Sequence, residues 1–149
     1  MTKHTPVSGS LLLAVIVAAL IVAGIRLIRS DVGVCREAFA GLAQGRSAAG
    51  WRLDWERLQA MGVNVGETYR GLPNAQERRQ YRRSFIGQFA GGFARSGATA
   101  SAFTNWRPAG VRDGKRLVAA DYPAKQQTLL FSVSGAWFSR RIGSIQWQS

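Results

Sequence analysis

The longest apolar run of the chain lies close to its N-terminus. No charged residue occurs between Thr5 and Ile25, and the segment 11–24 (LLLAVIVAALIVAG) is almost purely apolar. A helix needs about 20 such residues to cross the hydrocarbon core of a bilayer. The pattern therefore predicts a transmembrane helix over Val7–Ile28, which makes residues 1–29 the tail and anchor of a single-pass membrane protein.

The charges around this run bear on the orientation of the chain. Lys3 precedes the run, and Arg26 and Arg29 follow it. The positive-inside rule favours a cytoplasmic C-terminal domain, whereas a short N-terminal tail commonly stays inside and exports the domain. We expect an inner-membrane protein whose domain, residues 30–149, is extracytoplasmic. A cleaved signal peptide is the alternative, although apolar residues continue past its expected cut after Gly24.

Helical periodicity dominates the first half of the domain. Apolar positions on one stripe predict a helix over Asp31–Ala43. Asp54 stands where a side-chain cap would begin a short helix over Trp55–Met61. The segment Val63–Leu72 is typical of a further turn or short helix.

The strongest local signal is a long helix over Asn74–Arg95. Asn74 and Glu77 have the spacing of a capping box, in which each side chain satisfies the backbone N–H of the other residue. Within the helix, aromatic side chains recur every four residues, at Tyr81, Phe85, Phe89 and Phe93. Such a stripe buries a large area only against a broad apolar surface.

The second half of the domain has the alternation of strands. Asp113-Gly114 marks a hairpin turn. Strands are predicted over Ala98–Arg107, Leu117–Tyr122, Thr128–Ser134 and Arg141–Gln148. Helices followed by strands indicate an α+β fold, in which the helices pack on a four-stranded antiparallel meander sheet in a cone-like arrangement.

This order of elements resembles the cystatin-like α+β cone of the nuclear transport factor 2 superfamily. The resemblance is topological and covers roughly residues 34–149. It implies a cone-shaped domain, and the superfamily includes isomerase-like enzymes, ligand-binding domains and assembly subunits, so the fold does not select the function. The segments that carry it are Asp54-Trp55-Glu56, Leu72-Pro73-Asn74, Tyr81-Arg82-Arg83 with Phe85-Ile86, Asn105-Trp106-Arg107, Ala119-Ala120-Asp121 and Ser144-Ile145-Gln146-Trp147.

Composition argues against most catalytic chemistries. The chain of 149 residues has one histidine, His4, and one cysteine, Cys35. Cysteine-rich zinc sites and Cys/His catalytic pairs are therefore excluded, and no carboxylate pair or Ser/His/Asp set is evident. We expect no catalytic residue, no cofactor and no metal. The alternative is a membrane-tethered ligand-binding or isomerase-like domain with a pocket lined by Asp121, Tyr122, Phe85 and Phe89.

The positive charge is the most informative feature for function. The formal net charge is +12, and arginine far outnumbers lysine, which favours bidentate contacts to carboxylates or phosphates. We interpret the chain as a non-catalytic accessory or assembly subunit that docks onto a larger membrane protein complex. Expected partners are an acidic protein surface and anionic lipid headgroups, with self-association an alternative and nucleic acid the weakest candidate because no binding motif accompanies the charge. The candidate contact residues are Arg78, Arg79, Arg82, Arg83, Arg112, Arg116, Trp137, Phe138, Arg140 and Arg141.

Overall fold

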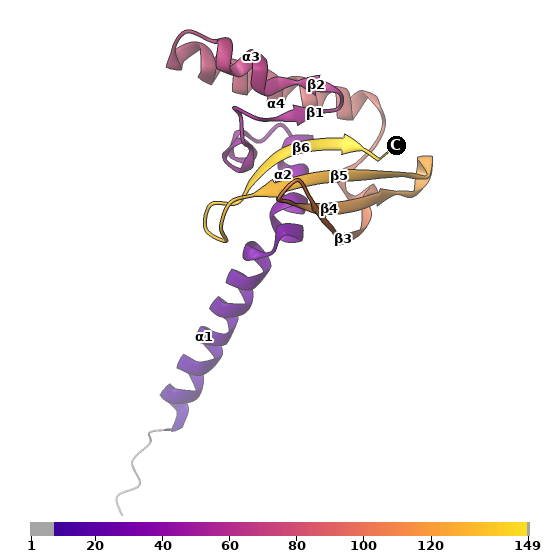
Figure 1. Ribbon diagram of the computed structural model, residues 1–149. Coiled ribbons are helices and arrows are strands. Elements are labelled where there is room, and N and C mark those ends of the chain that lie inside the picture. Colours follow the sequence, from indigo (N-terminus) through magenta and orange to yellow (C-terminus); the bar gives the residue numbers. More distant parts are fainter. Residues whose placement is uncertain (1–7, 149) are drawn as a thin grey trace, which may run out of the picture.

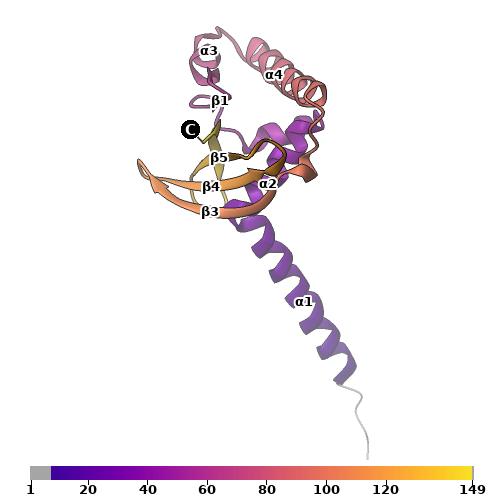
Figure 2. The same cartoon turned by 90° about the vertical axis from the view of Figure 1, so that its right-hand side faces the viewer.

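The computed structural model describes the backbone of residues 8–148 and the side chains of residues 10–23 and 30–148. Helix α1 (Ser8–Arg29) projects away from the rest of the molecule and is followed at once by α2 (Asp31–Ala43) (Figures 1 and 2). Ser30 separates the two helices and caps α2, since its Oγ accepts a hydrogen bond of 2.9 Å from the backbone N–H of Gly33. The predicted helix over Asp31–Ala43 is confirmed.

Helix α1 corrects the membrane prediction. Within the part of the chain that the structure describes, no helix combines the length and the apolarity needed to span a membrane. The transmembrane helix predicted over Val7–Ile28, and the single-pass inner-membrane location inferred from it, are therefore overturned.

Several residues used in the membrane argument lie outside the described part of the chain. These are Lys3 and Val7, together with the side chains of Arg26 and Arg29; His4, the one histidine, also lies outside it.

The sheet corrects the predicted meander. It has six strands in the order β2-β1-β6-β5-β4-β3, and the pair β1–β6 is parallel whereas every other pair is antiparallel. The prediction of a four-stranded antiparallel sheet is therefore wrong, although the fold is α+β. The strands are β1 (Gln59–Ala60), β2 (Val63–Asn64), β3 (Thr104–Arg112), β4 (Lys115–Tyr122), β5 (Gln127–Ser134) and β6 (Arg141–Trp147).

Strand β1 occupies part of the short helix predicted over Trp55–Met61, and β2 takes the first two residues of the turn or short helix predicted over Val63–Leu72, of which α3 forms the rest. Ala60 pairs with Ile145 of β6, and the backbone N–H of Met61 donates to the carbonyl of Ile145 at 2.8 Å. Met61 and Gly62 form the two-residue turn to β2, with positive φ angles of 49° and 83°. Positive φ at both positions is the geometry of a tight hairpin turn, and methionine gives little sign of it in the sequence.

The remaining helices are α3 (Val65–Gly71) and α4 (Ala75–Arg95), together with the short 3-10 helices η1 (Ser47–Arg52), η2 (Ala100–Ala102) and η3 (Pro123–Lys125). Asn74 is confirmed as the N-cap of α4, because its Oδ1 accepts from the Glu77 N–H at 2.9 Å. The return contact of Glu77 is made to the Asn74 side chain, whose Nδ2 donates to Glu77 Oε1 at 3.1 Å. The strand predicted from Ala98 begins only at Thr104, since η2 occupies the intervening residues.

Phe39 of α2 lies at the centre of the core. Its ring contacts Phe103 at 4.7 Å, Phe93 at 5.4 Å and Phe131 of β5 at 5.8 Å between centroids. The strands β3 to β5 curve past α2, and α4 lies on α2 and η1 above the sheet (Figures 1 and 2). Only Ile86 of α4 is fully buried, and the aromatic stripe of this helix is half-buried against the core.

Candidate anionic-partner site

A cavity of about 400 Å³ opens where the first half of α4, the turn η1 and the start of β6 meet. Its lining contains four arginines, and none of the described side chains that line it is acidic. Such a lining has the charge to bind an anion. We call it the arginine–tryptophan pocket, and it is lined by Ser47, Gly50, Trp51, Trp55, Arg79, Arg82, Arg83, Ile86 and Arg141.

Helix α4 supplies three of the four arginines. Arg79 and Arg83 are exposed and stand one turn apart on the helix, so both reach the same side of the cavity. Arg82 is half-buried, and its Nη1 donates to the hydroxyl of Tyr69 at 3.2 Å. Among the ion pairs of residues 30–148, none involves these three arginines. Their charge is therefore available to a partner.

Residues distant in the sequence complete the pocket. Arg141, at the start of β6, donates from Nη1 to the backbone carbonyl of Trp51, which ties η1 to the sheet. The Trp51 side chain is 77% exposed, whereas Trp55 is buried and its Nε1 donates to the carbonyl of Gly50 at 2.9 Å. Gly50 leaves room for this packing, because a Cβ there would lie 3.2 Å from the Ile86 Cδ1 atom.

Trp51 is not among the candidate contact residues that the sequence predicts. No local signal distinguishes Trp51 from Trp55, which stands one helical turn later in the chain. The difference arises from the path of the chain, since Trp51 lies on η1 and is exposed, whereas Trp55 follows η1 and is buried.

Three of the other predicted arginines are engaged within the fold. Arg78 turns toward α3, where its guanidinium lies 5.5 Å from the ring centroid of Tyr69 and its Nε donates to the Leu72 carbonyl at 3.3 Å. Arg116 and Arg140 both contact the carboxylate of Asp31, at 2.7 Å and 2.6 Å. The hydrogen bond to Asp31 raises the pKa of Arg116 above its usual value. None of the three lines the arginine–tryptophan pocket.

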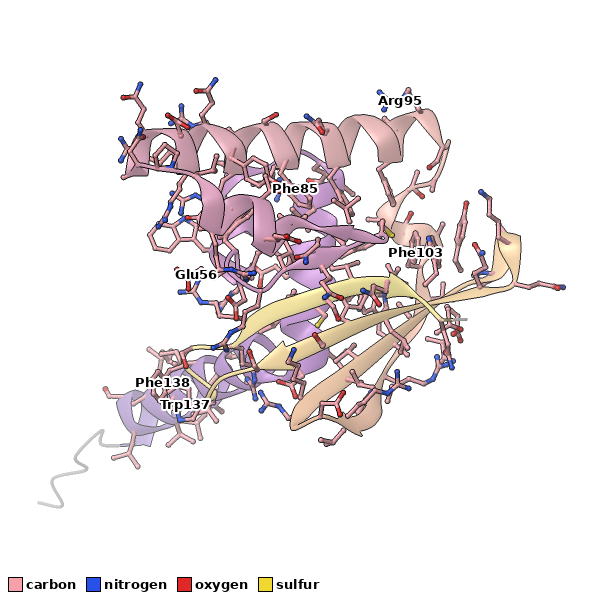
Figure 3. The ribbon with its side chains drawn as sticks, turned by 45° about the horizontal axis from the view of Figure 1, so that its top comes forward. Glu56, Phe85, Arg95, Phe103, Trp137 and Phe138 are labelled. Atoms are coloured by element: carbon pink, nitrogen blue, oxygen red, sulfur yellow. The ribbon has the colours of Figure 1, made fainter. Side chains whose placement is uncertain are left out.

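The remaining candidate contact residues lie elsewhere on the surface. Arg112 lines a second cavity of about 330 Å³ with Arg57 and Lys115, over the side of the sheet that faces away from the core. Trp137 and Phe138 are exposed on the loop between β5 and β6, with ring centroids 5.4 Å apart. Figure 3 shows these two rings together and well away from Phe85 and Arg95 of α4.

The residues of the alternative ligand pocket are not gathered around a free carboxylate. Asp121 accepts hydrogen bonds from Asn105 at 2.7 Å and from Arg107 and Thr128 at 2.9 Å each. These bonds, that of Asn105 foremost, lower the pKa of Asp121 below its usual value. Tyr122 points to the opposite face of β4, where its ring stacks on Phe103 at 4.8 Å.

The two phenylalanines of that alternative belong to the aromatic core. Phe85 packs edge-on against Trp55 at 5.5 Å, and Phe89 contacts Phe39 at 6.3 Å. Both rings are half-buried against the core.

Metal-ligand geometry and comparisons with known proteins add no further site. No group of three or more His, Cys, Asp or Glu side chains capable of holding a metal ion occurs among the residues with described positions. Searches against protein-family models, curated proteins and solved structures found no match to this chain. The cone-like resemblance to the nuclear transport factor 2 superfamily therefore stays a prediction.

Proposed function

We propose that the protein is a non-catalytic accessory or assembly subunit that docks onto an acidic surface of a larger protein complex. The observation that supports this most is the convergence of Arg79, Arg82, Arg83 and Arg141 on one cavity whose described lining has no carboxylate. Charge complementarity of this kind accelerates encounter and selects the partner.

The residue types of the pocket also favour a protein partner. Arginine and tryptophan are enriched at protein interfaces and among the residues that contribute most binding energy. Guanidinium groups bind carboxylates in bidentate geometry, which adds direction to the attraction. The exposed Trp51 beside Arg79 and Arg83 therefore makes a surface suited to an acidic segment with apolar character.

An excess of like charge also supports an external partner. The four arginines repel one another where they share a cavity, and this repulsion is relieved when an anion enters. Three arginines outside the pocket do have carboxylate partners, since Asp31 pairs with Arg116 and Arg140 and Asp121 pairs with Arg107.

A double variant tests the proposal. Arg79→Ser with Arg83→Ser removes two exposed charges from the pocket, and Arg95→Ser with Lys125→Ser removes two exposed charges that line neither described cavity. The full chain carrying an affinity tag is purified from its native cells after nuclease treatment, and the co-purifying proteins are quantified. We expect a set of proteins at fixed ratio with the wild type and the control variant, and its loss with the pocket variant.

Thermal unfolding keeps the result interpretable. We expect all three proteins to unfold at similar temperatures, because Arg79 and Arg83 are exposed and form no ion pair with a described carboxylate. Retention of the same protein set by the pocket variant would overturn the proposal. So would the absence of any fixed-ratio partner of the wild type.

A further inference from the structure

The lining of the arginine–tryptophan pocket combines two chemistries that a simple anion would not need together. Its rim is cationic, but its floor is apolar, made by Ile86 and the ring of Trp55, which are 4% and 7% exposed. A carboxylate alone would gain nothing from an apolar floor, because its charged form is stabilised by water and by hydrogen bonds. We therefore expect the ligand to carry an apolar group that packs on this floor.

The exposed indole of Trp51 forms a wall of the same cavity. Its backbone is held by the hydrogen bond from Arg141, while its side chain is 77% exposed. An indole so placed offers an aromatic face of large area at low cost in conformational entropy, since the backbone that carries it is already held in place. A second aromatic ring entering between this indole and the floor would cover apolar surface on both sides.

The cations that line the cavity come from two separate elements. Arg79 and Arg83 come from α4, and Arg141 comes from the start of β6. An extended segment that crosses the cavity from one element to the other would therefore meet arginine before and after the point at which its central side chain enters.

We infer that the pocket takes an aromatic side chain of the partner that is flanked on both sides by carboxylates. This inference rests on the proposed function and names the segment through which the acidic partner docks. A volume of about 400 Å³ lies near the lower end of ligand pockets, so it accommodates one large side chain with its neighbours rather than a whole helix.

Synthetic peptides test the inference directly on the full chain. The probe is the fluorescein-labelled peptide Asp-Glu-Phe-Glu-Asp, blocked at both ends, and its binding is followed by fluorescence anisotropy at low salt. One comparison peptide has alanine in place of phenylalanine, and another has Asn and Gln in place of the acids. We expect each comparison peptide to bind at least about tenfold more weakly than the probe, because each loses one of the two chemistries.

A double-mutant cycle locates the aromatic ring. We expect Trp51→Ala to weaken the binding of the phenylalanine peptide about tenfold and to leave the affinity for the alanine peptide nearly unchanged. Only the phenylalanine peptide has a ring to pack on the indole. Trp137→Ala is the matched control, since Trp137 is also exposed but does not line the pocket. It should change neither affinity.

The outcomes separate this inference from the proposed function. Equal binding of the phenylalanine and alanine peptides, or equal loss of both with Trp51→Ala, would overturn the aromatic specificity. If the double variant of Arg79 and Arg83 nevertheless loses the co-purifying complex, the proposed function stands with a different docking segment. Failure of every peptide to bind would also overturn the inference, and the co-purification result would still decide the proposed function.

Discussion

The carboxylate of Asp31, in the first turn of α2, lies 2.6 Å from the Nε of Arg140, the residue that precedes β6. The same carboxylate accepts two hydrogen bonds from Arg116 of β4, at 2.7 and 3.2 Å, so one acid serves two arginines. Arg116 also donates to the carbonyl of Gly135 at 2.9 Å. These contacts fasten the start of α2 to the two ends of the loop between β5 and β6.

Removing the Asp31 charge should destabilise the fold. Asp31→Asn leaves two arginines facing each other, with the Arg140 side chain only 15% exposed. We expect a loss of about 2 kcal/mol in the free energy of unfolding, less than for a fully buried pair because Arg116 is partly exposed. Urea denaturation measures the change. Asp113→Asn, in the exposed hairpin turn, is the control and should stay close to the wild type.

Truncation of Phe39 should be the most damaging change in the aromatic core. Phe39→Ala removes a ring that is 1% exposed and contacts rings from α4, β5 and the segment before β3. The expected cost is about 3–5 kcal/mol in the free energy of unfolding, from lost transfer energy and the cavity left behind. Phe138→Ala, which truncates an exposed ring, should change the same quantity by less than about 0.5 kcal/mol. A similar effect of both variants would contradict the central place given to Phe39.

The Asn74 cap at the start of α4 gives a smaller and more local prediction. Asn74→Ala removes the acceptor of the Glu77 N–H and the donor to its carboxylate. We expect the free energy of unfolding to fall by about 1 kcal/mol and the amides in the first turn of α4 to exchange their hydrogens faster. Gln76→Ala, on an exposed position of that turn, serves as the control.

The ionisation of Asp121 should make the stability of the fold depend on pH. Its pKa is lowered in the folded state by hydrogen bonds from Asn105, Arg107 and Thr128. A group with a depressed folded pKa stabilises the fold above its unfolded pKa, about 3.9, and this contribution is lost as the pH falls through the folded pKa. Between pH 6 and pH 2, the thermal midpoint of the wild type should therefore fall more steeply than that of Asp121→Asn. Parallel curves for the two proteins would show that the three hydrogen bonds do not favour the charged form.

Local signals in the sequence predicted the elements whose causes are local. The helix Asp31–Ala43 followed from the spacing of its apolar residues, and the start of α4 followed from Asn74 and Glu77. The hairpin at Asp113-Gly114 followed from a turn that requires positive φ, and both residues have it. Each of these features depends on residues within a few positions of one another.

The errors concern features that distant residues create. Gln59 and Ala60 form a strand because they pair with the edge of β6. A strand of two residues is too short to show the alternation of apolar and polar positions that would predict it. The six-stranded order followed from this pairing. Likewise, the four arginines of the pocket were selected as candidates one by one, but nothing local placed Arg141 beside α4 or turned Trp51 outward.

The parallel pairing of β1 with β6 has a consequence for biosynthesis. Of the described strands, β6 is the last to leave the ribosome, yet it lies inside the sheet, between β1 and β5. About 80 further residues are therefore translated after the hairpin of β1 and β2 before its neighbour β6 is synthesised. The last step of sheet formation must follow the synthesis of β6. Until then, the edges of β1 and β5 that will receive β6 stay open to incorrect pairing with other chains.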